Sequence, residues 1–329
     1  MTDLKEKLYQ MFILGFDGEY PSDRILDLLE KGLGGVILFT QNIKTKAQTK
    51  LTTKTISQRA KYFPFISTDE EGGRVERTEN LFDGKKFLSA RYAKEKGEEY
   101  IITQTREISK LLKELGFNLN FAPVLDVNTN PNNPIIGERA FSDNTDEVIK
   151  FGNLVVKEYI KNGIAPCTKH FPGHGDANSD SHLTLPEINL DFEDLETNHI
   201  RAFKEVQSPM VMVAHLYCKA FDDEKIPSSV SKNVLGYLKK IAPNSLIITD
   251  DMEMKGICKY KNPTDNIINA VLNGVNLILY RSSDDKTIQI IENVYKKALN
   301  NPDLQEKISS SFDKIIEFKK NFLPDLKFS

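Results

Sequence analysis

Residues 145–168 read TDEVIKFGNLVVKEYIKNGIAPCT and contain both parts of the unit that decides the fold. The apolar side chains of the first part recur with helical spacing, so we predict an amphipathic helix over Thr145–Asn162. Asn162-Gly163 is a helix-ending pair, and the apolar run Ala165–Thr168 that follows it has the length and composition of a buried strand. A helix that leads at once into a short apolar strand predicts a parallel sheet.

The same alternation runs along most of the chain. Eight short apolar runs are candidate strands: Met11–Phe16, Gly35–Phe39, Pro64–Ser67, Phe117–Ala122, Ala165–Thr168, Met210–Ala214, Leu246–Ile248 and Asn276–Leu279. Eight such runs separated by helical stretches predict a closed (β/α)₈ barrel of the TIM type. No linker, charge block or internal repeat divides the sequence, so we expect one domain over residues 1–329, with residues 303–320 as a final covering helix.

Composition and charge exclude several classes of protein. The chain carries 44 basic and 47 acidic residues without charge blocks, which disfavours a nucleic-acid-binding protein. Its longest apolar runs are far shorter than the ~20 residues of a membrane span, and its acidic N-terminus does not resemble a signal peptide. Cys167, Cys218 and Cys258 show no paired spacing, which argues against disulfides and against a cysteine zinc site. We therefore expect a cytoplasmic, monomeric globular protein.

The residues that follow the strands indicate an enzyme. In a barrel these strand ends converge on one face, where active sites lie. Polar residues could simply mark where strands emerge into solvent, but too many of these ends carry titratable groups for that explanation. The eight runs exit into Asp17, Thr40–Asn42, Asp69–Glu71, Pro123 with Asp126, Lys169-His170, His215, Asp250-Asp251 and Tyr280-Arg281.

The segment KHFPGHGDANSDSH at 169–182 holds three of the five histidines of the chain. His170 and His174 have the spacing of a helical zinc site, but Pro172 between them would break a helix. We therefore expect a fixed loop and no metal. Within it, Asp180 and His182 suggest a catalytic pair in which the carboxylate orients the imidazole, or alternatively an ordinary hydrogen bond that ties down the loop.

Three further residues are candidates for chemistry. Asp250 follows the apolar strand SLIIT and could serve as a metal ligand, a base or a nucleophile. Asp69 could accept two hydrogen bonds from a vicinal diol. The double glycine after it is not followed by the Lys-Ser/Thr of a phosphate-binding loop. Arg139 offers a planar fork for a polar substrate group, or it pairs with a nearby acid.

These segments resemble a known family. Asp69–Arg77, Gly137–Phe141, Lys169–His182 and Thr249–Met254 are similar, in order, to the signatures of glycoside hydrolase family 3. More narrowly, they resemble its single-domain β-N-acetylglucosaminidases, which are cytoplasmic enzymes of bacterial cell-wall recycling. The resemblance implies a (β/α)₈-type barrel that needs no cofactor and cleaves terminal GlcNAc from β-linked sugars with retention of configuration.

The resemblance also implies roles for single residues. Asp250 corresponds to the nucleophile, His182 to the proton donor and Asp180 to its orienting partner. The residues that correspond to those gripping the sugar are Asp69, Arg77, Arg139, Lys169 and His170. The sequence departs from the common pattern at Glu70 and Glu76, where glutamine is more usual, and at Met252, where leucine is more usual; these changes affect the expected details on the leaving-group side.

The expected substrate is a small oligosaccharide or muropeptide with a terminal β-GlcNAc. Four alternatives stay open at this point. A histidine acid/base leaves no anion where the second nucleophile arrives, so phosphate could replace water and make the enzyme a phosphorylase. The chain could have another family 3 β-glycosidase specificity, or it could be a noncatalytic sugar-binding barrel. A metal-dependent hydrolase would need ligands beyond His170, and His215 is the only other histidine at a strand end.

Overall fold

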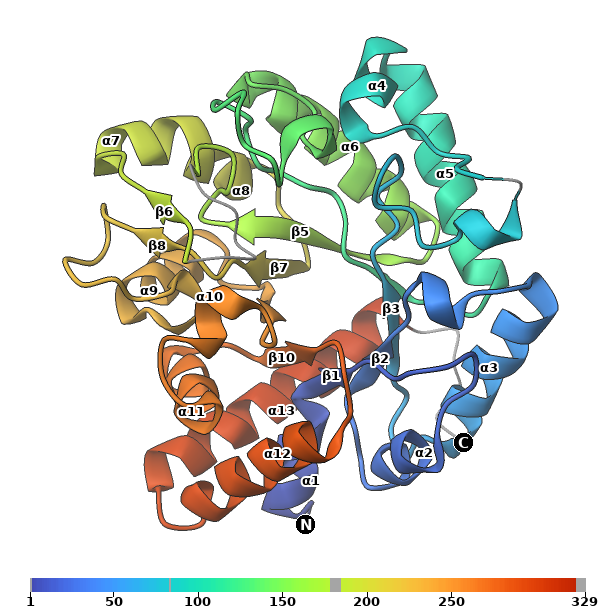
Figure 1. Cartoon of the computed structure of the whole chain (residues 1–329), viewed down its shortest axis with the longest axis vertical. Coiled ribbons are helices and arrows are strands. Elements are labelled where there is room, and N and C mark those ends of the chain that lie inside the picture. Colours follow the sequence, from blue (N-terminus) through green and yellow to red (C-terminus); the bar gives the residue numbers. More distant parts are fainter. Residues whose placement is uncertain (1, 83, 178–184, 324–329) are drawn as a thin grey trace.

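The fold of the chain is a closed barrel of parallel strands (Figure 1). The structure, a computed structural model, describes residues 2–82, 84–177 and 185–323. Around the barrel the strands follow in the order β1 (Phe12–Leu14), β10 (Leu277–Tyr280), β9 (Leu246–Asp251), β7 (Met210–Val213), β5 (Ala165–Phe171), β4 (Leu119–Asn120), β3 (Phe65–Thr68) and β2 (Gly35–Ile37). β2 then pairs with β1 and closes the ring.

Each of the eight predicted apolar runs overlaps one barrel strand, so the predicted TIM-type (β/α)₈ barrel is confirmed. The strands are almost wholly buried, because side chains of one face fill the barrel interior and those of the other pack under helices. This burial on both faces explains why the strands form near-continuous apolar runs rather than alternating ones.

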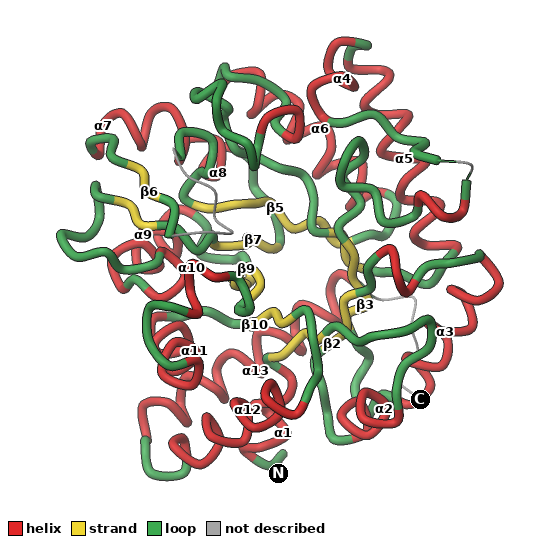
Figure 2. Tube along the Cα trace, viewed as in Figure 1, coloured by secondary structure: helices red, strands yellow, loops and turns green. Residues whose placement is uncertain are grey.

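Helices surround the ring of strands (Figure 2). The predicted helix at 145–162 is α6, which begins after Asn144, whose side chain accepts a hydrogen bond from the Glu147 amide. The α-helices are α1 (Leu4–Gln10), α2 (Asp23–Glu30), α3 (Lys46–Arg59), α4 (Ala90–Glu95), α5 (Glu98–Glu114), α6 (Thr145–Lys161), α7 (Phe192–Leu195), α8 (Arg201–Glu205), α9 (Lys232–Ile241), α10 (Lys255–Cys258), α11 (Pro263–Asn273), α12 (Asp285–Ala298) and α13 (Pro302–Phe322).

Helix α13 is the C-terminal helix predicted at 303–320, and it packs where the strands begin. The Phe318 ring meets the Phe65 ring of β3 edge to face, with 5.7 Å between their centroids. The Lys319 ammonium donates to the Gly34 carbonyl just before β2, at 2.8 Å. α13 therefore covers the N-terminal end of the barrel and leaves the opposite end for the site.

Two strands lie outside the barrel. β6 (Glu187–Ile188) and β8 (Tyr217–Cys218) pair with each other in parallel. They were not predicted, because neither lies in a continuous apolar run of the length expected for a strand. No helix in the described ranges is long and apolar enough to cross a membrane.

Candidate active site

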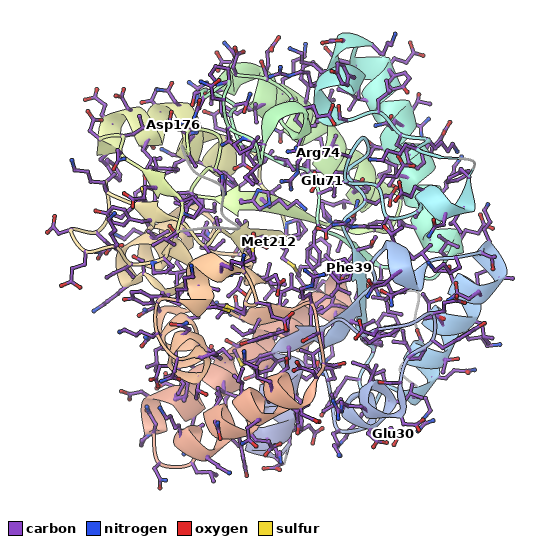
Figure 3. The ribbon with its side chains drawn as sticks, viewed as in Figure 1. Glu30, Phe39, Glu71, Arg74, Asp176 and Met212 are labelled. Carbon is purple, nitrogen blue, oxygen red and sulfur yellow. The ribbon has the colours of Figure 1, made fainter. Side chains whose placement is uncertain are left out.

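A cavity of about 500 Å³ opens at the C-terminal ends of the strands. Figure 3 labels Phe39, Glu71 and Met212, which line it near the centre of the barrel, whereas Glu30 lies at the periphery. The volume is in the usual range for small-molecule sites. Every predicted site residue that the structure describes lines this cavity: Asp69, Arg77, Arg139, Lys169, His170 and Asp250.

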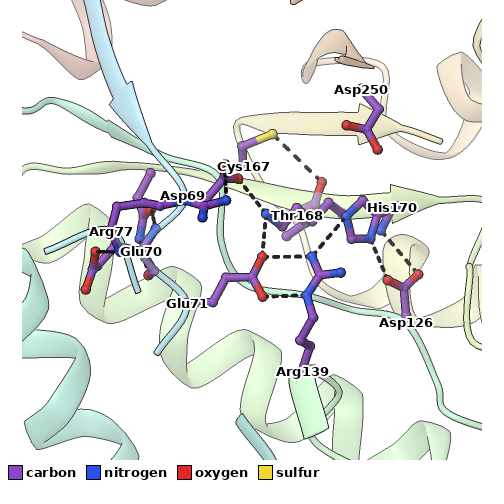
Figure 4. Close-up of polar contacts among 12 residues, drawn as sticks. Asp69, Glu70, Glu71, Arg77, Asp126, Arg139, Cys167, Thr168, His170 and Asp250 are labelled. Atoms are coloured by element: carbon purple, nitrogen blue, oxygen red, sulfur yellow. Dashed lines mark hydrogen bonds and ion pairs between the residues drawn. The ribbon is translucent and has the colours of Figure 1, made fainter. Parts of the chain in front are cut away.

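Lys169 joins two carboxylates of the charged network, those of Asp69 and Glu71, both of which are labelled in Figure 4. Its side chain is 2% exposed, and its ammonium contacts Asp69 Oδ1 at 2.9 Å and Glu71 Oε1 at 2.6 Å. Although burial opposes it, the attraction of these carboxylates raises the pKa of Lys169. Asp69 is also 3.6 Å from the Arg77 guanidinium. Since an ammonium has three hydrogens, Lys169 keeps one for a further acceptor.

Arg139 forms the pair with an acid that the sequence left as an alternative. Its guanidinium holds Glu71 with two parallel hydrogen bonds of 2.8 and 2.9 Å. Burial would raise the pKa of Glu71, but Arg139 and Lys169 lower it well below its usual range. The planar fork predicted for substrate is therefore engaged by protein, while one of its nitrogens lies 3.4 Å from His170 Nε2.

His170, in strand β5, is held by a carboxylate of the loop that follows β4. Its Nδ1 lies 2.6 Å from Asp126 Oδ2, while Asp126 Oδ1 accepts from the backbone amides of His170 and His174. Burial would raise the pKa of Asp126, but the adjacent His170 ring contributes to lowering it. With Nδ1 bound in this way, Nε2 of His170 is left beside the Arg139 guanidinium, in a residue that lines the cavity.

Residues 172–177, the described part of the segment after β5, form a loop rather than a helix, as Pro172 predicted. Gly175 is required there, because a Cβ at this position would lie 1.7 Å from the Val127 carbonyl oxygen. In the described part of the chain no group of three His, Cys, Asp or Glu residues is placed to hold a metal ion.

Asp250 lies near the end of β9, half-buried at the cavity wall. Its Oδ1 accepts the backbone amide of Asp251 at 2.7 Å. Behind the strand, the buried His215 ring bonds the Asp251 carbonyl oxygen through Nε2 and the Ser229 hydroxyl through Nδ1. Burial lowers the pKa of His215, so this histidine is a neutral clamp on the strand end that carries Asp250. Burial also raises the pKa of Asp251 to about 7.

Glu70, one of the departures from the family pattern, lies beneath the site. Its carboxyl group accepts hydrogen bonds from the backbone amides of Arg77 and Thr78 and from the Thr78 hydroxyl. Complete burial raises the pKa of Glu70 to about 8. An amide could satisfy the same partners, since the Thr78 hydroxyl can also accept a hydrogen bond.

The predicted pair Asp180 and His182 falls outside the described residues. Conversely, sequence reasoning did not select Glu71 and Asp126 for the site, although both lie just after strands. Their partners Arg139 and His170 are 68 and 44 residues away in sequence, so no local pattern shows the contacts. The cavity thus brings Asp250 together with fixed polar groups that are suited to bind hydroxyl groups of a small ligand.

Comparison with known proteins gives a consistent family. Residues 3–317 match the family described as "Glycosyl hydrolase family 3 N terminal domain". The chain is 34% identical to "Beta-hexosaminidase A" of Pseudoalteromonas piscicida over 87% of its own length and 53% of that protein. It is 30% identical to "Beta-hexosaminidase" of Actinobacillus pleuropneumoniae serotype 3, over 86% of the chain and 84% of the relative.

A solved structure of a glycoside hydrolase family 3 beta-N-acetylglucosaminidase from Paenibacillus sp. str. FPU-7 superposes with a TM-score of 0.93 at 31% identity. That match covers all of this chain and 64% of the Paenibacillus chain. The chain therefore spans about half of one of these relatives, about two thirds of another and most of the third.

Proposed function

Because the chain belongs to glycosyl hydrolase family 3, we propose that it is a retaining β-N-acetylhexosaminidase that hydrolyses terminal β-linked GlcNAc. The observation that carries the proposal is the position of Asp250, which shares one cavity with Asp69, Arg77, Lys169 and His170. Relatives named beta-hexosaminidase support the choice of sugar.

In the proposed mechanism Asp250 is the nucleophile. Its carboxylate attacks the anomeric carbon and forms a glycosyl ester, while the bond from that carbon to the leaving oxygen breaks. His182 gives its proton to the leaving oxygen, and Asp180 orients the imidazole. Neutral His182 then takes a proton from water, whose oxygen displaces Asp250 from the anomeric carbon. An imidazole with an ordinary pKa of about 6.5 can serve in both states near neutral pH.

The charged network would hold the sugar. Asp69 can accept from sugar hydroxyls while Lys169 and Arg77 fix its carboxylate. The remaining Lys169 hydrogen and the Nε2 edge of His170 can bind further sugar oxygens. Arg139 contributes by fixing Glu71, and through it Lys169. This differs from the direct substrate grip expected from the planar fork alone.

The natural substrate we propose is a peptidoglycan fragment of the GlcNAc-anhydroMurNAc type, handled in the cytoplasm by a monomeric, single-domain protein. These points rest on the resemblance in the motifs. Phosphorolysis by the same residues is the alternative reaction, supported by the histidine acid/base. It predicts GlcNAc 1-phosphate as product in phosphate buffer and free GlcNAc without phosphate.

Turnover of p-nitrophenyl β-GlcNAc, with and without a chelator, tests the activity. We expect hydrolysis in both conditions. No turnover would favour a noncatalytic sugar-binding barrel, and loss with chelator would favour a metal-dependent hydrolase. Proton NMR of the first product tests the stereochemistry: retention gives the β-anomer of GlcNAc first, and early α-anomer would rule out the covalent mechanism.

A further inference from the structure

The cavity rim carries one guanidinium that the charged network does not use. Leu279 and Arg281 both line the cavity, as expected for residues two apart at the end of β10. Arg77, Arg139 and Lys169 each contact a carboxylate. Over the described ranges, by contrast, the Arg281 guanidinium forms no hydrogen bond or ion pair and lies over the Phe39 ring.

Phe39 and Arg281 meet across the end of β1. The Arg281 guanidinium carbon lies 6.0 Å from the centroid of the Phe39 ring, and that of Arg77 lies 5.6 Å from the same centroid. β1 lies between β2 and β10 in the barrel, and Gly15 follows it. A Cβ on Gly15 would lie 2.0 Å from the Arg281 carbonyl oxygen, so only glycine allows this approach.

The backbone of Arg281 is also fixed from the catalytic side. Its amide donates to Asp251 Oδ1 at 3.2 Å, next to Asp250 in sequence. Arg281 is thus an exposed residue whose backbone is fixed and whose guanidinium lies over an aromatic ring. A cation held in this way loses little entropy on binding an anion, and a guanidinium binds carboxylate or phosphate with two parallel hydrogen bonds.

We propose that Arg281 and Phe39 form an oxyanion-binding subsite on the leaving-group side of the cavity. Its ligand is a carboxylate carried by the leaving group, or a free phosphate that replaces water. In the second case a phosphate oxygen bonds to the anomeric carbon as the ester bond to Asp250 breaks, which regenerates the carboxylate. The inference rests on the proposed function. It adds that the leaving group, or the phosphate that replaces water, carries a negative charge.

The test compares two substrates, p-nitrophenyl β-GlcNAc and its 3-carboxy derivative, in wild type, Arg281→Ala and Arg281→Lys. We expect the ratio of kcat/KM, carboxylated over neutral, to fall about tenfold in Arg281→Ala and less in Arg281→Lys. Lys255→Ala is the matched control. It removes the same charge from an exposed rim residue that does not line the cavity, and its ratio should stay within twofold of wild type.

The second arm supplies inorganic phosphate and measures GlcNAc 1-phosphate. Phosphate-dependent product that Arg281→Ala loses would assign the subsite to free phosphate instead of the leaving group. Calorimetric binding of the free 3-carboxy-4-nitrophenol gives the same comparison of variants without turnover. If the wild type does not turn over the neutral substrate, that result contradicts the proposed function alone, because the binding experiment still tests the subsite. The subsite would be overturned if Arg281→Ala left three quantities unchanged: the kcat/KM ratio, the amount of GlcNAc 1-phosphate and the binding of 3-carboxy-4-nitrophenol.

Discussion

Lys169 and Lys319 are both buried, one at each end of the barrel, and their surroundings differ. Lys169 at the mouth contacts two carboxylates, and its pKa is raised. Lys319 at the base contacts the side-chain oxygen of Gln10, the Gly34 carbonyl and the face of the Phe65 ring. Burial lowers the pKa of Lys319 to about 7.

The difference indicates that the two ends of the barrel have different roles. The mouth holds fixed charges by pairing them, which preserves a polar surface for substrate at the cost of desolvation. At the N-terminal end of the barrel, the partners of Lys319 are neutral. Its amine fills space there and donates hydrogen bonds to carbonyl oxygens. Substitutions at the mouth should therefore change activity as well as stability, whereas those at the base should change stability and its pH dependence and leave activity unchanged.

The largest effect is expected for Asp250→Ala. Loss of a covalent nucleophile should lower kcat on p-nitrophenyl β-GlcNAc by about 10⁴-fold or more while the melting temperature changes little. Lys319→Met, at the other end of the barrel, is the control and should keep wild-type kcat. Near-normal activity of folded Asp250→Ala would refute its assignment as nucleophile.

His182→Ala should show a loss that depends on the leaving group. An acid is needed for a poor leaving group, where its contribution is about 10²–10⁴-fold, and hardly for an activated aryl group. Asp180→Asn should show the same bias more weakly, because it disturbs the tautomer of the imidazole without removing it. Rates on p-nitrophenyl β-GlcNAc and on a β-GlcNAc disaccharide, with melting temperatures alongside, measure it. Equal losses on both substrates would make the pair a structural clamp.

Lys169→Met and Lys319→Met compare the two ends directly. Removing Lys169 leaves Asp69 and Glu71 without a shared cation, so the free energy of unfolding should fall by about 3–5 kcal/mol and activity should fall too. Removing Lys319 exchanges a costly buried amine for an apolar chain and should cost less. Urea denaturation at pH 7 measures both. If Lys319→Met were the more destabilised variant, the proposed difference between the ends would be wrong.

The smallest effect is a pair of opposite pH dependences. Since the pKa of folded Lys319 is below its unfolded value, its destabilisation is complete below about pH 7 and fades as pH rises toward that unfolded value. Between pH 7 and 9 the free energy of unfolding of the wild type should therefore rise by about 2 kcal/mol relative to that of Lys319→Met.

The contribution of Glu70 to stability should change with pH in the opposite direction to that of Lys319. The folded pKa of Glu70 is raised to about 8, so its contribution is present at low pH and is lost as pH rises toward 8. Between pH 6 and 9 the free energy of unfolding of the wild type should therefore fall by about 3 kcal/mol relative to that of Glu70→Gln. Unfolding free energies at several pH values check both variants, and two slopes of the same sign would contradict the assignment.

The sequence was sufficient for the barrel because strands buried on both faces form distinct apolar runs. It also pointed to Asp69, Lys169 and His170, since strand ends converge in a barrel. It could not show that Arg139 is engaged by Glu71 or that His170 is held by Asp126, because each of those contacts joins residues far apart in the sequence. The burial of Lys319 could not be predicted from the sequence either. Only the packing of α13 on Gly34 and Phe65 shows that this lysine faces inward.

The central claim is that Asp250 forms a covalent bond to the sugar. A 5-fluoro-GlcNAc fluoride forms the glycosyl ester quickly and hydrolyses slowly, so the intermediate accumulates. Peptide mapping of the inactivated protein should then find one sugar-sized mass increase on the peptide from β9, with fragmentation placing it on Asp250. A label on Asp251 or elsewhere, or no label from a protein that turns over p-nitrophenyl β-GlcNAc, would contradict it.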